Sequence, residues 1–287
     1  MRYRKYLHYT IAVLTFLLLP RLVLSQSDTI LQNTEEQNHS LYAGVNYGSN
    51  LIYLGSTISG NLPYFSAALT YSLKNKLFIS ASASHVSETS PYIAFSSLSA
   101  SYTQTINSWF DYSASAAYYK TAESLQETLF NDFGYINLTA GFDWKILYTK
   151  LSFSGVLSEA NGGYIQIRNS RYFQTGLFLK EKAFISFDPN FSFLFGQIVD
   201  VESTTGSSKY RNAPPFGRFK RNPGSTTTEY SYSFGMIDTE FSLPVTLNFS
   251  NFSIEAEALY ILPVYSNPEY SSPEGFSFNI TALIKIF

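Results

Sequence analysis

Four carboxylates near the C-terminal end of the chain have a spacing that could place them on one surface. Asp238 and Glu240 are two residues apart, and so are Glu255 and Glu257. In an extended strand, residues i and i+2 share a face, so each pair would project to one side. Carboxylates held close together attract cations, and their pKa values rise unless cations neutralise them. The pattern indicates either a salt-bridged polar cluster or a cation-favouring constriction.

The composition excludes several other kinds of site. The 287 residues include no Cys and only three His, which excludes disulfides, thiolate metal sites and histidine clusters. We therefore expect no metal site and no cofactor. The net charge of -2 argues against nucleic acid as a partner, since nucleic-acid-binding proteins normally carry a basic stripe. Charged residues make up 14% of the chain, well below the usual share in soluble proteins, and 17% are aromatic.

The elements that must position the carboxylates are strands. From residue 40 onward, apolar residues alternate with small polar ones in short segments, which is typical of strands with two different faces. In residues 65–73 the odd positions are apolar and the even positions are Ser, Thr or Ala. The expected strands are residues 41–53, 65–73, 77–84, 98–106, 110–118, 136–142, 147–157, 173–179, 183–195, 230–247, 252–261 and 276–286.

Neighbouring strands must agree on which side is apolar, because a one-residue slip reverses both faces. This rule predicts three-residue turns at 74–76, 107–109 and 180–182, and two-residue turns at 144–145 and 249–250. The last of these would set Glu257 opposite Ser242 and Glu240 opposite Leu259.

Two irregularities interrupt the alternation. The apolar phase slips between Met236 and Ile237, which predicts a bulge or the edge of the bilayer there. Pro189 and Pro244 fall inside strands, where a residue without an N–H requires a bulge or a strand end.

Short turns alternate with long connections, the strand count is even, and the apolar face is rich in aromatic residues, as in bacterial outer-membrane barrels. In lipid the sheet must close, because an open edge would leave backbone groups unpaired. We predict an all-β fold, a closed antiparallel transmembrane β-barrel of twelve strands with up-and-down topology, monomeric, with both termini in the periplasm and outer-membrane lipid against its apolar face. The alternative, a soluble β-sandwich or secreted repeat protein, would need more charge on that face.

The N-terminus is predicted to be a secretory signal peptide, because basic residues precede an apolar stretch and the small residue Ser25. Pro20 and Arg21 interrupt the stretch before it could span a membrane. We expect cleavage near Ser25 and location in the outer membrane. The expected parts are a signal peptide at 1–25, a flexible periplasmic segment at 26–39 and the barrel at 40–287.

The run Phe241-Ser242-Leu243-Pro244-Val245, then Ile261-Leu262-Pro263-Val264 and a last strand ending at Phe287, resembles the C-terminal part of a family of outer-membrane barrels of Bacteroidota. The resemblance covers residues 241–287 and implies a fold and a location but no activity. The terminal Phe287 is similar to the signal read by the barrel-assembly machinery, which is the partner expected during insertion. The match is partial, because Lys285 stands at a position that the signal wants apolar.

If the apolar face meets lipid, the charged side chains of the strands point inward. We expect them to form a belt in the periplasmic half, with Lys285 as the cation nearest to the carboxylates. A barrel of about eight strands is filled by its side chains, and one of about sixteen or more holds a water channel. Twelve strands fall between these numbers, so the strand count does not decide between a filled and an open lumen. Besides Asp111, the belt comprises Asp143, Lys150, Lys180, Asp188, Asp238, Glu240, Glu255, Glu257 and Lys285.

The longest connection, residues 199–229, is basic and allows three interpretations. It could be a solvated loop, a clamp on the anionic phosphates of lipid A, or a loop folded inward onto the acidic belt. Its cationic residues are Lys209, Arg211, Arg218, Lys220 and Arg221.

His85-Val86-Ser87 is similar to the His-x-Ser pairing of outer-membrane phospholipase A. A triad needs a third group to orient the imidazole, but no Asn follows in residues 97–106 and the calcium ligands of that family are missing. A lipase is therefore a minor alternative, and we expect no enzyme. We expect a small passive channel for ions or small solutes, or alternatively a non-conducting surface scaffold that uses the basic loop.

Overall fold

The structure is a computed structural model of the chain, which describes residues 38–126, 128–158, 162–180, 182–203, 206–211, 229–264 and 273–287. The predicted signal peptide lies outside the described residues. No helix in these residues is long and apolar enough to cross a membrane.

Nearly all of the regular structure in these residues is strand. The elements are β1 (His39–Gly48), β2 (Ile52–Tyr53), β3 (Ser56–Thr57), β4 (Tyr64–Leu73), β5 (Leu77–Val86), β6 (Phe95–Asn107), β7 (Phe110–Thr121), the 3-10 helix η1 (Glu123–Leu125), β8 (Phe133–Asp143), β9 (Tyr148–Leu157), β10 (Gly162–Ser170), β11 (Phe173–Gln174), β12 (Ala183–Phe187), β13 (Asn190–Ser203), β14 (Gly206–Arg211), β15 (Glu229–Phe249), β16 (Phe252–Pro263) and β17 (Gly275–Lys285).

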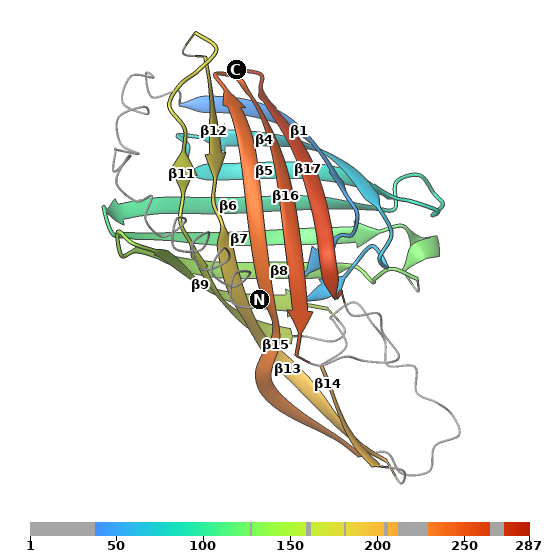
Figure 1. The fold of residues 1–287 in the computed structure, drawn as a ribbon. Coiled ribbons are helices and arrows are strands. Elements are labelled where there is room, and N and C mark those ends of the chain that lie inside the picture. The colour runs from blue at the N-terminus through green and yellow to red at the C-terminus, as the bar shows by residue number, and fades with distance from the viewer. Residues whose placement is uncertain are drawn as a thin grey trace, which may run out of the picture. The chain divides into compact units, whose positions relative to one another are not determined.

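The described strands form a closed antiparallel barrel (Figure 1). The ring runs β1, β4, β5, β6, β7, β8, β9, β10, β13, β15, β16 and β17, and β17 pairs with β1 to close it. Three further strands do not add to the count. β11 follows β10 in the same wall strand, β12 precedes β13 in the same wall strand, and β14 pairs with the part of β13 outside the ring. The wall therefore has twelve strands. The predicted fold class is confirmed.

The two faces of the wall differ as the alternation predicted. On β4, Phe65 and Leu69 point outward and are 41% and 55% exposed, whereas the preceding Tyr64 points inward and is 6% exposed. Inward hydroxyls bond one another across strands, for example Thr70 Oγ1 to Ser80 Oγ at 2.9 Å. The outward apolar face of a closed sheet is what a bilayer requires, and the barrel is therefore a transmembrane one.

The eighth strand differs from the prediction. It is formed mainly by β10, which begins at Gly162, whereas the predicted segment 173–179 retains only the two residues of β11. β10 pairs along its length with β9 and also with β13. Its alternation is interrupted on the inward face by the charged residue Arg168, which hid the strand from a pattern based on apolar and small residues.

Three of the five turns keep the predicted odd or even count, and only the first has the predicted residues. The turns predicted at 107–109 and 180–182 change from an odd to an even count. Residues 74–76 form a three-residue turn between β4 and β5. The expected 107–109 turn is two residues, 108–109, with an irregularity in register at Thr105/Asn107 that takes up the odd residue. The others are four residues from 144 to 147, four between Phe178 and Ala183, and two at 250–251. Parity fixes the faces, but it does not fix the length or position of a turn.

The bulge predicted next to Met236 is confirmed, because the β13–β15 register skips Ile237 between the pairs Leu194↔Asp238 and Phe195↔Met236.

Pro189 and Pro244 lie at one discontinuity. Pro189 sits between β12 and β13, and the backbone N–H of Asp188 in the same gap donates to the Pro244 carbonyl. Proline is tolerated at this gap between β12 and β13, because the ladder is interrupted there and the proline nitrogen does not have to donate a hydrogen bond.

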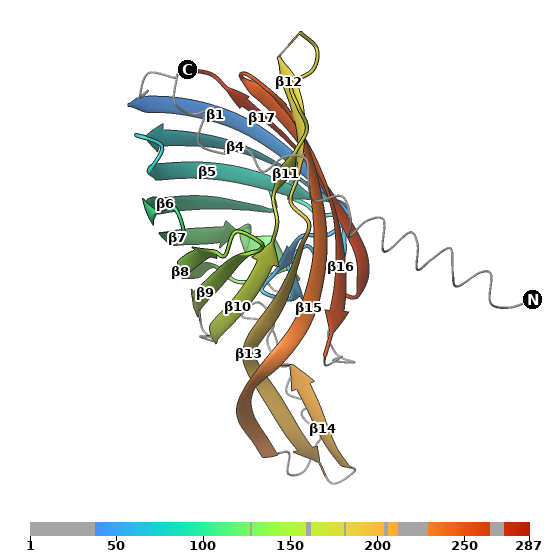
Figure 2. The ribbon, with the colours of Figure 1, turned by 60° about the vertical axis from the view of Figure 1, so that its left-hand side comes forward.

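The two rims of the barrel are unlike. The short turns and both ends of the described chain lie at one rim, where the Leu41 N–H donates to the Phe287 carbonyl at 3.0 Å. At the other rim, β13, β14 and β15 extend beyond the wall, at the end opposite the C-terminus (Figures 1 and 2). We call these the short-turn rim and the long-loop rim.

Candidate functional site

The predicted carboxylates on β16 point into the lumen. Glu255 accepts a hydrogen bond from Thr246 Oγ1 at 2.8 Å, and Glu257 accepts one from Ser242 Oγ. The predicted pairings across this hairpin are wrong by two residues. Glu257 lies opposite Pro244, Ser242 opposite Leu259, and Glu240 opposite Ile261, because the turn is residues 250–251 rather than 249–250.

Lys285 lies on the strand next to these carboxylates but is displaced from them along the sheet. Glu255 lies opposite Thr281 on β17, and Lys285 is four residues further toward the short-turn rim, opposite Tyr42. At about 3.3 Å per residue this separation is roughly 13 Å along the strand.

The predicted belt separates into lumen and rim residues. Lys150, Asp188, Glu240 and Asp238 belong to inward positions of the wall. Asp143 accepts from the Lys145 backbone N–H at 2.7 Å in the turn after β8.

Lys180 is exposed at a φ of 58° in the connection before β12, so it does not line the lumen. The expectation of one continuous belt is therefore wrong at that position, because the hairpin reaches past the end of the ring.

Arg168 is an inward charge that the sequence pattern missed. It lies directly between Lys150 on β9 and Ser192 on β13, and Ser192 Oγ donates to Glu240 at 2.9 Å. Two cations opposite each other repel, so the carboxylates around them stabilise this side of the lumen.

A compact network surrounds Lys150 near the short-turn rim. Its Nζ lies 5.5 Å from the centroid of the Tyr148 ring, and the Tyr148 hydroxyl donates to Asp111 at 2.6 Å. Gly141 makes room for the network, since a Cβ there would lie 2.2 Å from the Tyr148 hydroxyl. Asp111 is thus an inward residue, as expected.

The remaining inner wall is lined by small hydroxyl side chains. They form cross-strand bonds such as Ser82 Oγ to Ser97 Oγ at 2.7 Å and Thr139 Oγ1 to Ser152 Oγ at 2.9 Å. Lys150, an inward residue of β9, is exposed. This half of the lumen therefore contains space that water can reach.

The long-loop end of the lumen is closed by the first long connection, residues 49–63, which we call loop 1. Its β2–β3 hairpin crosses the barrel. On one side the Tyr53 ring lies 5.9 Å from Tyr119 of β7 and 5.1 Å from Tyr135 of β8. On the other, a Cβ on Gly55 would lie 2.3 Å from Asp238 Oδ2 of β15 and 3.0 Å from Leu194 of β13.

Residues 122–132, which we call loop 3, complete the closure together with inward residues of the wall. The resulting apolar cluster excludes water: Phe130 and Val86 are 0% exposed, and Ile58 is 2% exposed. Burial, together with the neighbouring Tyr119 and Tyr135 hydroxyls, raises the pKa of Tyr53 well above its ordinary value. We call this the apolar plug; its buried members are Ile58, Tyr64, Val86, Ala94, Phe95, Leu125, Phe130, Phe133, Val156, Tyr164, Leu194 and Ile237.

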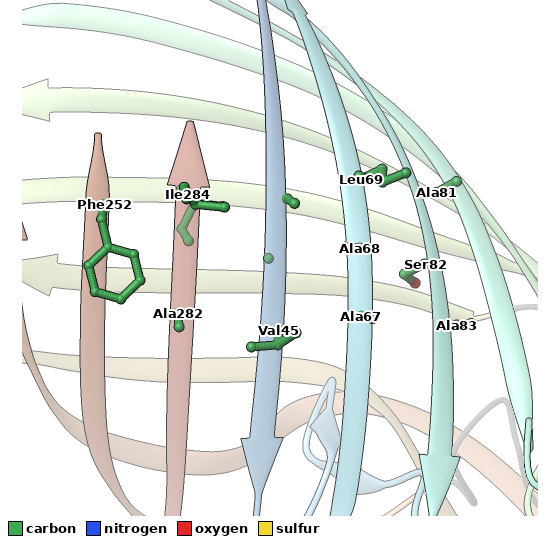
Figure 3. A pocket seen from close by; sticks show the side chains of 13 residues that line it. Val45, Ala67, Ala68, Leu69, Ala81, Ser82, Ala83, Phe252, Ala282 and Ile284 are labelled. Atoms are coloured by element: carbon green, nitrogen blue, oxygen red, sulfur yellow. The ribbon is translucent and has the colours of Figure 1, made fainter. Parts of the chain in front are cut away.

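The outward face has a shallow groove of about 670 Å³ over β17, β1, β4 and β5 (Figure 3). Alanines such as Ala67, Ala83 and Ala282 form its floor, and Phe252 and Leu69 border it. Because it lies on the lipid-facing side, it is separate from the lumen.

His85 and Ser87 are at the long-loop rim. His85 Nδ1 donates to the Tyr92 carbonyl at 2.7 Å, and its ring stacks on Tyr92 with centroids 4.3 Å apart. The Ser87 backbone N–H donates to the Pro63 carbonyl. The contacts of His85 thus anchor a loop.

The basic loop is described only in part. Lys209 and Arg211 belong to β14, whereas Arg218, Lys220 and Arg221 lie outside the described residues. Among the described residues, loop 1 crosses the lumen, and its residues 49–53 were predicted to belong to the strand 41–53. Within the described chain, no three His, Asp or Glu residues come together as metal ligands would.

No protein-family model matches the chain, and no curated protein sequence matches it. Several solved structures are similar in fold. The NanC porin is 7% identical, with 86% of this chain and 100% of that chain covered and a TM-score of 0.45. LpxR from Salmonella typhimurium is 8% identical, covering 85% and 99%, with a TM-score of 0.43. An outer-membrane channel from Pseudomonas putida F1 is 10% identical, covering 92% and 100%, with a TM-score of 0.41.

Proposed function

We propose that the protein is an outer-membrane conduit for ions or small polar solutes that is closed at rest. The observation that supports this function is the coexistence, in one barrel, of a water-accessible lumen lined by hydroxyl and charged groups with a dry apolar plug at the long-loop end. A lumen that served only as filling would not leave an inward charge such as Lys150 exposed. Because of the plug, we propose a gated conduit where the sequence led us to expect a passive channel.

Planar-bilayer recording tests this function. Folded wild-type protein should give no steady conductance, whereas a variant in which residues 50–61 are replaced by a short Gly-Ser linker should give discrete steps. Heat-modifiable migration in gels controls for folding of both. Steady conductance of the wild type would contradict closure, and a folded but silent linker variant would contradict the conduit.

A surface scaffold is the second candidate, and the extension of β13, β14 and β15 beyond the long-loop rim favours it. Partners should then co-purify with the protein and be lost when Lys209 to Arg221 are deleted. The same deletion should leave heat-modifiable folding intact. If nothing co-purifies before the deletion, the scaffold role fails.

The proposal includes the export route. We propose cleavage near Ser25, insertion through the barrel-assembly machinery with Phe287 as part of its signal, and a monomer in lipid. Mass spectrometry of the mature N-terminus tests the cleavage site. A Phe287→Ala variant, expected to insert more slowly, tests the signal.

A further inference from the structure

The two loops of the apolar plug are attached to the wall in different ways. Loop 3 is bonded to its flanking strands. Asp132 accepts from the Thr121 backbone N–H at 2.9 Å and from the Tyr118 hydroxyl at 3.2 Å, and the Ala122 N–H donates to the Ala94 carbonyl at 2.9 Å. Within loop 3, Ser124 Oγ also donates to the Ser90 carbonyl at 3.4 Å, so loop 3 is bonded to a neighbouring connection as well as at its two ends.

Loop 1 is bonded to the wall by the backbone at its two ends and by the Tyr53 hydroxyl, which makes hydrogen bonds with Tyr119 and Tyr135. The Ser49 N–H donates to the Phe278 carbonyl at 3.0 Å, and the Pro63 carbonyl accepts from the Ser87 N–H at 2.8 Å. Between these points, β2 and β3 form a sheet of their own that is separate from the barrel sheet. Moving this hairpin breaks no ladder bond of the wall.

Loop 1 is also braced internally. Asn50 Oδ1 accepts from Thr57 Oγ1 at 2.6 Å and from Ser59 Oγ at 3.0 Å, and Asn50 Nδ2 donates to Asn61 at 2.7 Å. The Ile58 N–H donates to the Leu51 carbonyl at 2.8 Å. These bonds would persist if the hairpin moved, so it can move as one piece.

The tip of the hairpin fits closely against the opposite wall. Gly55 has a φ of 70°, and a Cβ there would lie 2.3 Å from Asp238 Oδ2, 3.0 Å from Leu194 and 3.2 Å from Ile237. Asp238 is 0% exposed, so its carboxylate cannot move aside without displacing its neighbours. Only a glycine allows this approach.

A second glycine in the same loop provides a contrast. Gly60 has a φ of 66°, so a side chain would strain its backbone about as much as at Gly55, yet a Cβ there would meet nothing within 4 Å. The two glycines thus separate backbone strain from the fit against the wall.

We propose that loop 1 is the moving gate of the conduit, that it pivots at residues 49 and 63 against a fixed loop 3, and that the contact of Gly55 with Asp238, Leu194 and Ile237 holds it closed. Release of the hairpin joins the water-accessible lumen to the exterior at the long-loop rim. This inference rests on the proposed function, a conduit closed at rest.

The first test compares Gly55→Ala with Gly60→Ala in planar bilayers. Gly55→Ala should raise the open probability at least about tenfold, since crowding at the contact disfavours only the closed state. Gly60→Ala should stay within about twofold of the wild type, since its Cβ enters open space. Heat-modifiable migration again controls for folding.

The second test locks the gate. The chain contains no native Cys, so a Gly55→Cys, Asp238→Cys pair can be oxidised cleanly, and Asp238→Cys also removes the carboxylate oxygen nearest to the new Cβ. Oxidation should form the cross-link and abolish openings, and dithiothreitol should restore them. This arm remains informative if Gly55→Ala does not fold.

The outcomes separate the two proposals. A wild type that conducts steadily overturns the closed resting state, and a folded loop-1 replacement that never conducts overturns the conduit. If the replacement opens but folded Gly55→Ala stays as closed as Gly60→Ala, the Gly55 contact is not the latch. If the oxidised cysteine pair still opens, loop 1 is not the moving part.

Discussion

The two ends of the lumen are built on the same sheet but filled by opposite chemistry. Toward the long-loop rim, Ile58 of loop 1 and Phe130 of loop 3 pack against wall residues such as Val86 and exclude water. Toward the short-turn rim, hydroxyls and charges bond one another and the space stays open. The inward positions of the strands also differ, because Val86, Phe95 and Leu194 are apolar at the long-loop end whereas hydroxyl side chains line the other end. The wall thus supplies an apolar surface, and the loops packed on it complete the closure.

The largest expected effect tests whether the apolar plug can lose its structure independently of the barrel wall. Phe130→Ala should destabilise the closed arrangement of loops 1 and 3 by about 3–5 kcal/mol, because a fully buried aromatic ring is removed. Hydrogen exchange should show lost protection in residues 50–62 and 122–132. Protection of β4 to β9 should be unchanged, and equal loss there would mean that plug and wall form one unit.

The next effect concerns the open end. Gly141→Ala should destabilise the barrel by about 1–3 kcal/mol, because its Cβ would overlap the Tyr148 hydroxyl and the Asp111 carboxylate. Gly163→Ala is the matched control, since a Cβ there meets nothing within 4 Å. Urea unfolding in detergent measures both. Similar urea unfolding midpoints for the two variants would show that the network around Lys150 can rearrange to accept the new Cβ.

The plug should also respond to strong alkali. The pKa of Tyr53 is raised on closure, so its contribution to closure is complete below the ordinary tyrosine pKa near 10 and is lost above it, by about 1.4 kcal/mol per pH unit. Openings should increase between about pH 10 and 11. Tyr53→Phe should remove that dependence. An unchanged pH profile in Tyr53→Phe would assign the effect to another group.

The smallest effect concerns selectivity once the lumen is open. In a Gly55→Ala background, Glu255→Gln with Glu257→Gln should lower cation preference by no more than about fivefold, the effect of roughly 1 kcal/mol for a charge near an ion in water. Reversal potentials in a salt gradient measure the preference. Asp143→Asn at the rim is the control and should change it less.

The sequence carried enough information for the fold because each wall strand repeats the same two-sided pattern. It also located the bulge beside Met236, where the phase slips. It missed β10, since Arg168 interrupts the inward pattern, and it misplaced the turn after β15 by one residue at each end. Parity is satisfied equally by residues 249–250 and 250–251, so only the contacts across the hairpin decide between them.

The gate could not be predicted from the sequence. The alternation of the predicted strand 41–53 continues through Leu51 and Tyr53, although β1 ends at Gly48. The partners of loop 1, Tyr119, Tyr135 and Leu194, are far along the chain. The one local signal was Gly55, a residue suited to the positive φ of a tight turn. That signal indicates a turn and says nothing about where the turn rests.

The pairing of β1 with β17 makes the first and last strands of the chain neighbours, from Tyr42 opposite Lys285 to Gly48 opposite Asn279. A growing polypeptide cannot make this junction until β17 has been synthesised, so every product without β17 has two unpaired sheet edges. Such edges are templates for unwanted pairing. The cell must therefore keep the chain unfolded during its passage to the membrane, and premature termination near the end would yield an open sheet in place of a smaller barrel.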